Sequence, residues 1–190
     1  MNFNSHFELV GKHALLSASK YHWTNYDDDK FETHLTTHQL AQRGTDLHAL
    51  AAEMIRLKVK LPRNSQTLNS YVNDALGYRM TPEQVLMYSY NCFGTADAIS
   101  FHRDLLRIHD LKTGTSKASF RQLEIYAAMF CLEYRLKPAE ISMEFRIYQS
   151  DEVLLLEGEP DEITHIMDKI IRFDKRITTR SLEVVLCLIP

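Results

Sequence analysis

Apolar residues recur at helical spacing in four segments of the chain. The pattern is longest over residues 36–59 and continues over residues 66–77, where Gly77 marks a stop. Residues 119–135 and 161–177 show the same amphipathic spacing further along. The sequence therefore predicts two helices early in the chain and two later ones.

Between these helices lie runs rich in aromatic and β-branched residues, which are typical of strands. Polar turns are expected at residues 80–83 and 102–104. The apolar C-terminal segment, residues 182–190, fits either a strand or a packed tail. The predicted strands cover residues 84–93, 94–101, 105–113, 140–148 and 152–158.

The order of these elements predicts the fold class. Helices come first, then a meander of three strands, a helix, two strands and a last helix. This order indicates an α/β or α+β protein with a central mixed β-sheet flanked by helices. A chain of 190 residues can bury a substantial core, and no linker-like stretch divides it, so residues 1–190 are expected to form a single domain.

Composition narrows the function classes. The chain is 45% hydrophobic with a net charge of −3, which argues against indiscriminate binding of polyanions. Lys and Arg nevertheless prevail in residues 54–79 and 102–137, giving either a local positive face or a mixed solvated surface. The N-terminus does not resemble a signal peptide, no apolar run approaches a membrane span, and the three scattered cysteines fit reduced cytosolic thiols.

Two carboxylates are predicted to meet near the ends of neighbouring strands. Alternation puts Asp110 and Lys112 on one strand face. A hairpin centred on the 102–104 turn puts Asp97 about opposite His109, beside Asp110. Such carboxylates repel one another unless a cation lies between them or one of them takes up a proton. A divalent ion resolves the repulsion, and Mg²⁺ prefers oxygen ligands. With an amine alongside, this arrangement suits metal-assisted phosphodiester hydrolysis.

The Asp-x-Lys motif alone is too short to be specific. A second match occurs at residues 28–30, in a polar run with no apolar strand before it. We interpret that match as a solvated turn or a helix start. Only Asp110 and Lys112 follow a strand that has a second carboxylate one strand upstream.

Five short motifs follow one another along the chain: LSASK (16–20), GTDLH (44–48), GTAD (94–97), DLKTG (110–114) and QLEIY (122–126). In this order they resemble the motifs of the PD-(D/E)xK nuclease superfamily, in the branch of the RecB nuclease domain and lambda-type exonucleases. The similarity spans residues 16–157. The resemblance implies a restriction-endonuclease-like core, with residues 60–83 as a lineage-specific helical insertion.

The resemblance implies a metal centre. His48, Asp97 and Asp110 would bind Mg²⁺ or Mn²⁺, together with the backbone carbonyl of Leu111. Members of the superfamily that hold an iron–sulfur cluster carry four cysteines for it, and this chain lacks that set, so no cluster is expected.

The resemblance also implies roles for three further side chains. Lys112 would orient or activate the attacking water and stabilise charge that develops on the phosphate. Gln122 and Tyr126 would line the site and contact DNA or Lys112. The residues expected to contact DNA are Ser17, Lys20, Thr113, Lys117 and Arg121.

Each of these residues has a structural alternative. His48 could be a packed histidine, Asp97 could bond a turn, and Lys112 could be a solvent-facing strand end. Gln122 stands three residues after a serine, the spacing of a capping box. Tyr126 also falls on the apolar stripe of its helix.

The expected function is a cytoplasmic divalent-metal-dependent DNA nuclease, an exonuclease more than an endonuclease, of the stand-alone kind found in phages. It would act in DNA recombination, replication or repair, in the host cytoplasm if phage-encoded, with DNA as partner and no membrane. A homo-oligomer or a recombination or replication partner is compatible with this function. The alternatives are an inactive nucleic-acid-binding protein on the same fold and a structural or regulatory protein.

Overall fold

The structure is a computed structural model that describes residues 14–16 and 18–187, without the side chains of residues 19–21 and 181–187. The chain divides into two compact units, residues 1–46 and 47–190. In its described part, the first unit contains the 3₁₀ segment η2 (Ala18–Asn25) and the beginning of α1 (Asp28–Arg56). The second unit contains every strand of the described structure. The expectation of a single domain stays a prediction.

Helix α1 begins eight residues earlier than its apolar pattern predicts. The Asp27 carboxylate accepts a hydrogen bond from the backbone N–H of Lys30 at 2.8 Å, which satisfies one of the free donors of the first turn. Asp28 and Asp29 add negative charge there, where the helix dipole favours it. The second Asp-x-Lys match is therefore a helix start, one of the two alternatives considered for it.

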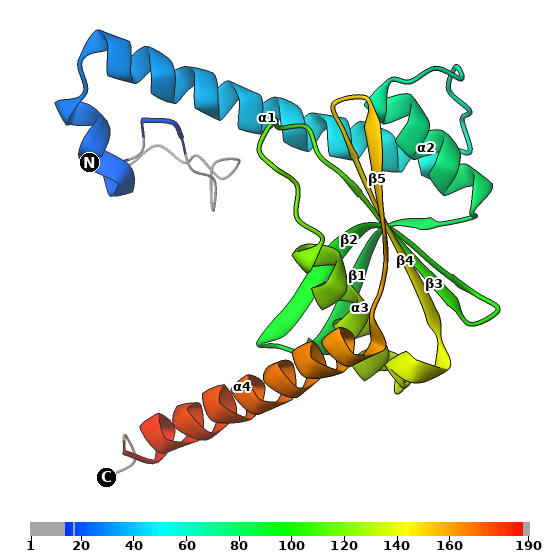
Figure 1. Cartoon of the computed structure of the whole chain (residues 1–190). Coiled ribbons are helices and arrows are strands. Elements are labelled where there is room, and N and C mark those ends of the chain that lie inside the picture. Colours follow the sequence, from blue (N-terminus) through cyan, green and yellow to red (C-terminus); the bar gives the residue numbers. More distant parts are fainter. Residues whose placement is uncertain (1–13, 17, 188–190) are drawn as a thin grey trace. The chain divides into compact units, whose positions relative to one another are not determined.

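A five-stranded mixed sheet forms the centre of the second unit (Figure 1), in the order β1-β2-β3-β4-β5. Only β3 and β4 are parallel, and α3 connects them; the other neighbours are antiparallel. The predicted α/β class with a mixed sheet and flanking helices is confirmed. The strands are β1 (Thr81–Ser89), β2 (Cys92–His102), β3 (Leu105–Leu111), β4 (Ser142–Gln149) and β5 (Glu152–Glu157).

The helices of the second unit follow the sequence pattern closely except at the C-terminus. The predicted helix at 66–77 is confirmed as α2, whereas the last helix runs ten residues beyond the predicted end at 177, so the strand and tail predicted for 182–190 are wrong as far as Cys187. Residues 188–190 lie outside the described part. The helices are α2 (Thr67–Gly77), α3 (Arg121–Tyr134), the 3₁₀ turn η3 (Pro138–Glu140) and α4 (Pro160–Cys187).

The first hairpin of the sheet differs from the prediction. The turn expected at 80–83 is wrong, because β1 begins at Thr81 and pairs with β2 from there. The single strand expected over 84–93 is also wrong, because residues 90–91 form the turn between β1 and β2. Proline at position 82 suits this place, since β1 is an edge strand.

The β2–β3 hairpin closes with a two-residue loop. Arg103 and Asp104 both have positive φ, 50° and 61°, as a tight turn matched to strand twist requires. The turn centre therefore lies between these two residues, and the ladder pairs Ala98 with His109. The expected register is wrong by one residue, and its continuation puts Asp97 directly opposite Asp110.

Alternating strand residues build two cores, one on each face of the sheet. Leu106 and Ile108 belong to the core covered by α3 and α4. Leu111 belongs to the other core, where the end of α1 and helix α2 pack. Tyr71 and Val72 of α2 are fully buried there, so the stretch 60–83 contributes to the core of the second unit.

None of the described helices combines the length and the apolar character that a membrane span requires.

Candidate metal centre

Asp97 is the central residue of the candidate site. Its Oδ2 accepts a 2.8 Å hydrogen bond from the backbone N–H of Leu111 on the neighbouring strand. The same oxygen lies 3.3 Å from Nδ1 of His48, which stands on the part of α1 that packs against the sheet. Sheet and helix together therefore hold this carboxylate in place. The structure brings together His48 and Asp97, two of the residues to which the resemblance assigns a metal, and their binding of a metal stays a prediction.

Glu83 completes a group that the sequence did not predict. One potential ligand atom from each of His48, Glu83 and Asp97 lies within 4.8 Å of the other two. The β1–β2 ladder pairs residues 82 with 98 and 84 with 96, so Glu83 faces Asp97. Glu83 has φ = 51°, a conformation that is uncommon for a residue other than glycine and costs free energy. Because a strained backbone conformation of this kind is often kept at functional sites, it supports the hypothesis that Glu83 has a functional role.

The pKa values of the site indicate excess negative charge. The hydrogen bond with Asp97 raises the pKa of His48, although burial acts in the opposite direction. Burial raises the pKa of the Glu83 carboxyl, and the charge of Asp97 raises it further. Burial also raises the pKa of Asp110, again with help from Asp97 and against the effect of Lys112. A cation at this site would relieve the repulsion among the carboxylates.

Asp110 lies beside this group and pairs with Lys112. Its side chain is 5% exposed, and its Oδ1 accepts a hydrogen bond of 3.1 Å from the Lys112 ammonium. Although Oδ2 lies 3.0 Å from the same nitrogen, this buried oxygen accepts no hydrogen bond of ordinary geometry from any described residue. Direct metal binding by Asp110 and by the carbonyl of Leu111 stays a prediction.

Lys112 continues into a chain of polar contacts on α3. Its ammonium donates to Oε1 of Gln122 at 2.9 Å, and Nε2 of Gln122 donates to the Tyr126 hydroxyl at 3.1 Å. The capping-box alternative for Gln122 is wrong, because the helix N-cap is Phe120 and the Ser119 hydroxyl accepts a hydrogen bond from the N–H of Arg121 instead of that of Gln122. Gln122 and Tyr126 therefore stand where they can position Lys112.

The loop after β3 and the first residue of α3 carry three of the five residues predicted to contact DNA. Lys117 and Arg121 line a hollow of about 300 Å³ together with Lys112. Thr113 lies in the loop directly after Lys112. Gln149 of β4 fixes the loop, since its side-chain amide donates to the backbone carbonyls of residues 114 and 116.

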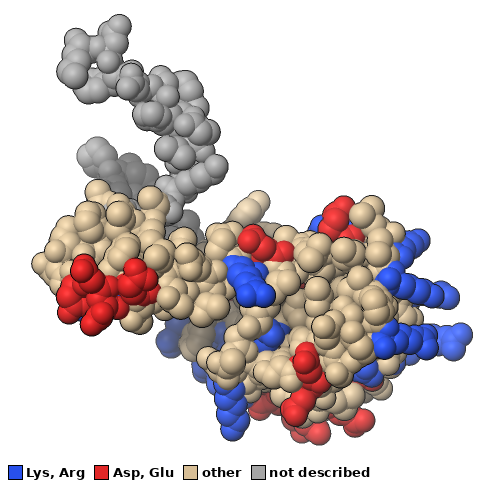
Figure 2. All heavy atoms as spheres, turned by 90° about the horizontal axis from the view of Figure 1, so that it is seen from above, with Lys and Arg blue, Asp and Glu red and all other residues tan. Residues whose placement is uncertain are grey.

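Of the predicted DNA contacts, Arg121 is ion-paired within the protein, and Ser17 and Lys20 have no described side chain. Arg121 pairs with Glu124 at 3.2 Å and also with Glu162 of α4. Ser17 lies outside the described residues, and Lys20 is described only by its backbone in η2. Several Lys and Arg side chains project together from the surface in Figure 2, and Asp and Glu form separate patches.

The donor set suits a divalent metal. An imidazole nitrogen with two carboxylates is compatible with Mn²⁺ and related first-row ions, and the carboxylates also suit Mg²⁺. His48 and Asp97 remain partly exposed, with side-chain exposures of 29% and 16%, so solvent can reach the group. The arrangement can therefore hold a metal with open positions for water or a phosphate.

The resemblance to PD-(D/E)xK nucleases depends only on the short motifs of this sequence and not on similarity to a known protein. No family model, curated protein or solved structure matches the chain. Membership of the superfamily is accordingly a matter for proposal.

Proposed function

We propose that this protein is a divalent-metal-dependent deoxyribonuclease with a restriction-endonuclease-like core. The observation that carries the proposal is the group of His48, Glu83 and Asp97, with ligand atoms within 4.8 Å of one another. The ion pair of Asp110 and Lys112 supports it, because it supplies an amine next to the group. Hydrolysis of DNA phosphodiester bonds is the reaction that this combination suits best.

The residues have distinct roles in this proposal. His48, Glu83 and Asp97 would hold Mn²⁺ or Mg²⁺, with Asp110 as a further oxygen donor. The bound ion would supply Lewis-acid polarisation of the phosphate and acidify a water molecule. Leu111 contributes its N–H, which orients the Asp97 carboxylate.

Lys112 acts on the phosphate. Its ammonium stabilises the charge that develops on the phosphoryl oxygens in the transition state, and it orients the attacking water. Gln122 accepts a hydrogen bond from Lys112 and is itself bonded to Tyr126, so the two side chains restrict where the ammonium can lie. These two are positioning residues, since their hydrogen bonds connect them to the phosphate only through Lys112.

The biological role follows from the resemblance. We propose an exonuclease of phage type that acts in the cytoplasm, in DNA recombination, replication or repair. Cleavage of labelled linear DNA but not of closed circular DNA would support the exonuclease assignment.

The test is cleavage of labelled DNA in the presence of Mg²⁺, Mn²⁺ or EDTA. We expect cleavage only with metal, and its loss in Asp97→Asn. Asp104→Asn is the matched control, because this exposed aspartate stands in the β2–β3 turn, where asparagine also tolerates the positive φ of 61°.

Three results would contradict the proposal. They are cleavage that persists in EDTA, equal activity of Asp97→Asn and Asp104→Asn, and DNA binding without cleavage under any metal. The last result would favour the inactive nucleic-acid-binding alternative.

A further inference from the structure

Helix α4 carries a basic face between residues 169 and 180. At 100° per residue, Lys and Arg side chains occupy an arc about 140° wide, running from Lys175 through Arg172 to Arg180. The arc extends about 16 Å along the helix, the length of about five base-pair steps. We call this set the basic arc; its members are Lys169, Arg172, Lys175, Arg176 and Arg180.

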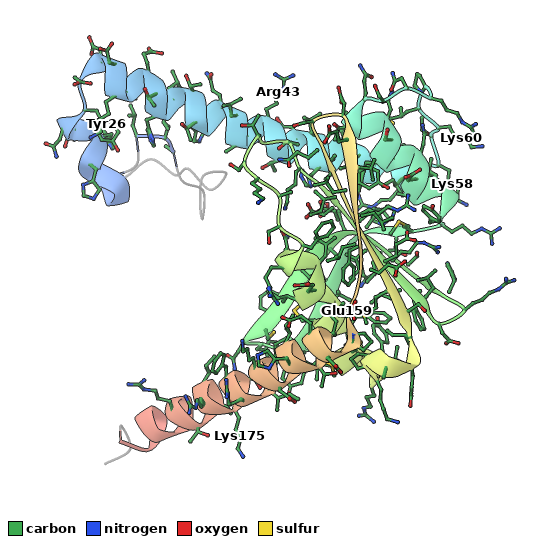
Figure 3. The ribbon with its side chains drawn as sticks, viewed as in Figure 1. Tyr26, Arg43, Lys58, Lys60, Glu159 and Lys175 are labelled. Atoms are coloured by element: carbon green, nitrogen blue, oxygen red, sulfur yellow. The ribbon has the colours of Figure 1, made fainter. Side chains whose placement is uncertain are left out.

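The contacts of α4 fix the direction of this arc. Asp174 accepts hydrogen bonds from the Ser89 hydroxyl at 2.6 Å and from the Asn91 amide at 2.9 Å, both at the β1–β2 turn. Asp174 lies about 160° around the helix from Arg172 and Arg176. The arc therefore points away from the sheet, and Figure 3 shows Lys175 projecting outward from α4.

The charges of the arc are unpaired in the described structure. All five side chains are exposed, and none forms an ion pair with a described carboxylate. By helical spacing, two acidic residues of α4 fall in the same arc after the first turns of the helix, Asp168 and Glu183. The acidic excess of the C-terminal third thus lies mainly before this face, at residues 140–162.

The basic arc is continuous with the candidate site. Arg121 lines the 300 Å³ hollow that contains Lys112 and Lys117. The same arginine lines a second hollow, of about 500 Å³, together with His165 and Lys169 of α4. Arg121, which is also ion-paired with Glu124 and Glu162, therefore links the hollow beside Lys112 to the hollow beside Lys169 within one unit of the chain.

We infer that the basic arc of α4 binds the DNA backbone beyond the cleaved phosphate. This inference rests on the proposed function, and charge complementarity identifies the occupant: a row of unpaired Lys and Arg side chains neutralises phosphates and releases their counterions. An anionic membrane would also attract the arc. DNA is favoured because the row leads to the hollow beside Lys112 and the metal group.

The experiment measures binding of a fluorescent DNA of about 20 base pairs by the full chain in EDTA, at salt concentrations from about 50 to 200 mM. The test variant is Arg172→Gln/Arg176→Gln/Arg180→Gln, since glutamine retains helix propensity. The matched control is Lys58→Gln/Lys60→Gln/Arg63→Gln, three exposed basic residues elsewhere in the unit, of which Figure 3 labels Lys58 and Lys60.

Loss of three phosphate contacts should make the negative slope of log affinity against log salt shallower by about 2.7. Between the two salt concentrations, the affinity of the α4 variant should therefore fall by a factor about 40 times smaller than the affinity of wild type. The control should keep the wild-type slope. Circular dichroism checks that α4 remains folded.

The inference is overturned if the α4 variant binds DNA like wild type, or if the salt dependence of the control variant falls as much as that of the α4 variant. It is also overturned if the wild-type protein binds no DNA, or binds anionic vesicles in place of DNA. The fate of the proposed function is separate. DNA binding through α4 without metal-dependent cleavage would contradict the nuclease proposal but support the inference about α4. Metal-dependent cleavage by a protein whose α4 variant binds DNA like wild type would support the nuclease proposal but contradict the inference.

Discussion

The histidine His109 lies beside Asp110 on β3, and its burial predicts how the free energy of unfolding changes at acidic pH. The side chain is fully buried, and its Nδ1 lies 3.2 Å from the Tyr148 hydroxyl. Since that hydroxyl donates its proton to Asp74, Nδ1–H of His109 must be the donor to Tyr148. Burial lowers the pKa of His109 to about 3, and the charges of Arg146 and Arg107 act in the same direction.

The sign and size of the effect follow from linkage. An unfolded histidine has a pKa of about 6.5, so between pH 6.5 and pH 3 the unfolded chain binds a proton that folded His109 does not. The stabilisation is fully present above about pH 6.5 and is lost as pH falls. Between about pH 7.5 and 5 the loss from His109 amounts to about 2 kcal/mol.

Urea unfolding of wild type and His109→Phe at these two pH values tests the prediction. Phenylalanine does not titrate, so the variant should lose about 2 kcal/mol less than wild type, while contributions from the carboxylates cancel in the comparison. His109→Gln provides a second non-titrating side chain if the phenylalanine variant does not fold. The same loss of stability in wild type and variant would refute the reasoning.

Three further substitutions test other parts of the account. Lys112→Ala should reduce cleavage 10²- to 10³-fold, about 3–4 kcal/mol, yet leave Mn²⁺ affinity by calorimetry unchanged; lost metal affinity would argue against its role on the phosphate. Asp110→Asn should abolish cleavage and raise the melting temperature of the metal-free protein by removing carboxylate repulsion; wild-type activity would remove Asp110 from the mechanism. Gly158→Ala should destabilise the fold by about 1–3 kcal/mol, measured by thermal unfolding, because its Cβ would lie 2.7 Å from Cβ of Met143; an unchanged melting temperature would contradict the packing.

Much of the sheet could be predicted because local patterns determine it. Alternation along β3 put Asp110 and Lys112 on one face, and in the structure the Lys112 ammonium contacts both Asp110 and Gln122 of α3. The register was wrong by one residue because composition identifies a turn but not its number of loop residues. Arg103 and Asp104 adopt positive φ without a glycine to announce it.

Glu83 could not be predicted by the same means. The preceding proline suggested a turn, whereas the residue belongs to an edge strand with one distorted position. Pairing β1 with β2 about a turn at residues 90–91 would have put Glu83 opposite Ala98, one residue from Asp97. The irregularity between Met87 and Ser89, which the sequence does not indicate, shifts the register so that Glu83 faces Asp97. The proximity of His48 depends on how α1 packs on the sheet, and residue spacing alone does not determine this packing.

The central claim is that His48, Glu83 and Asp97 hold one divalent metal ion. The most direct measurement is anomalous scattering from crystals of the protein grown or soaked with Mn²⁺. The account predicts a strong anomalous peak within coordination distance of all three side chains, and its loss in Glu83→Gln. A protein saturated with Mn²⁺ elsewhere, with no peak among these three residues, would contradict it.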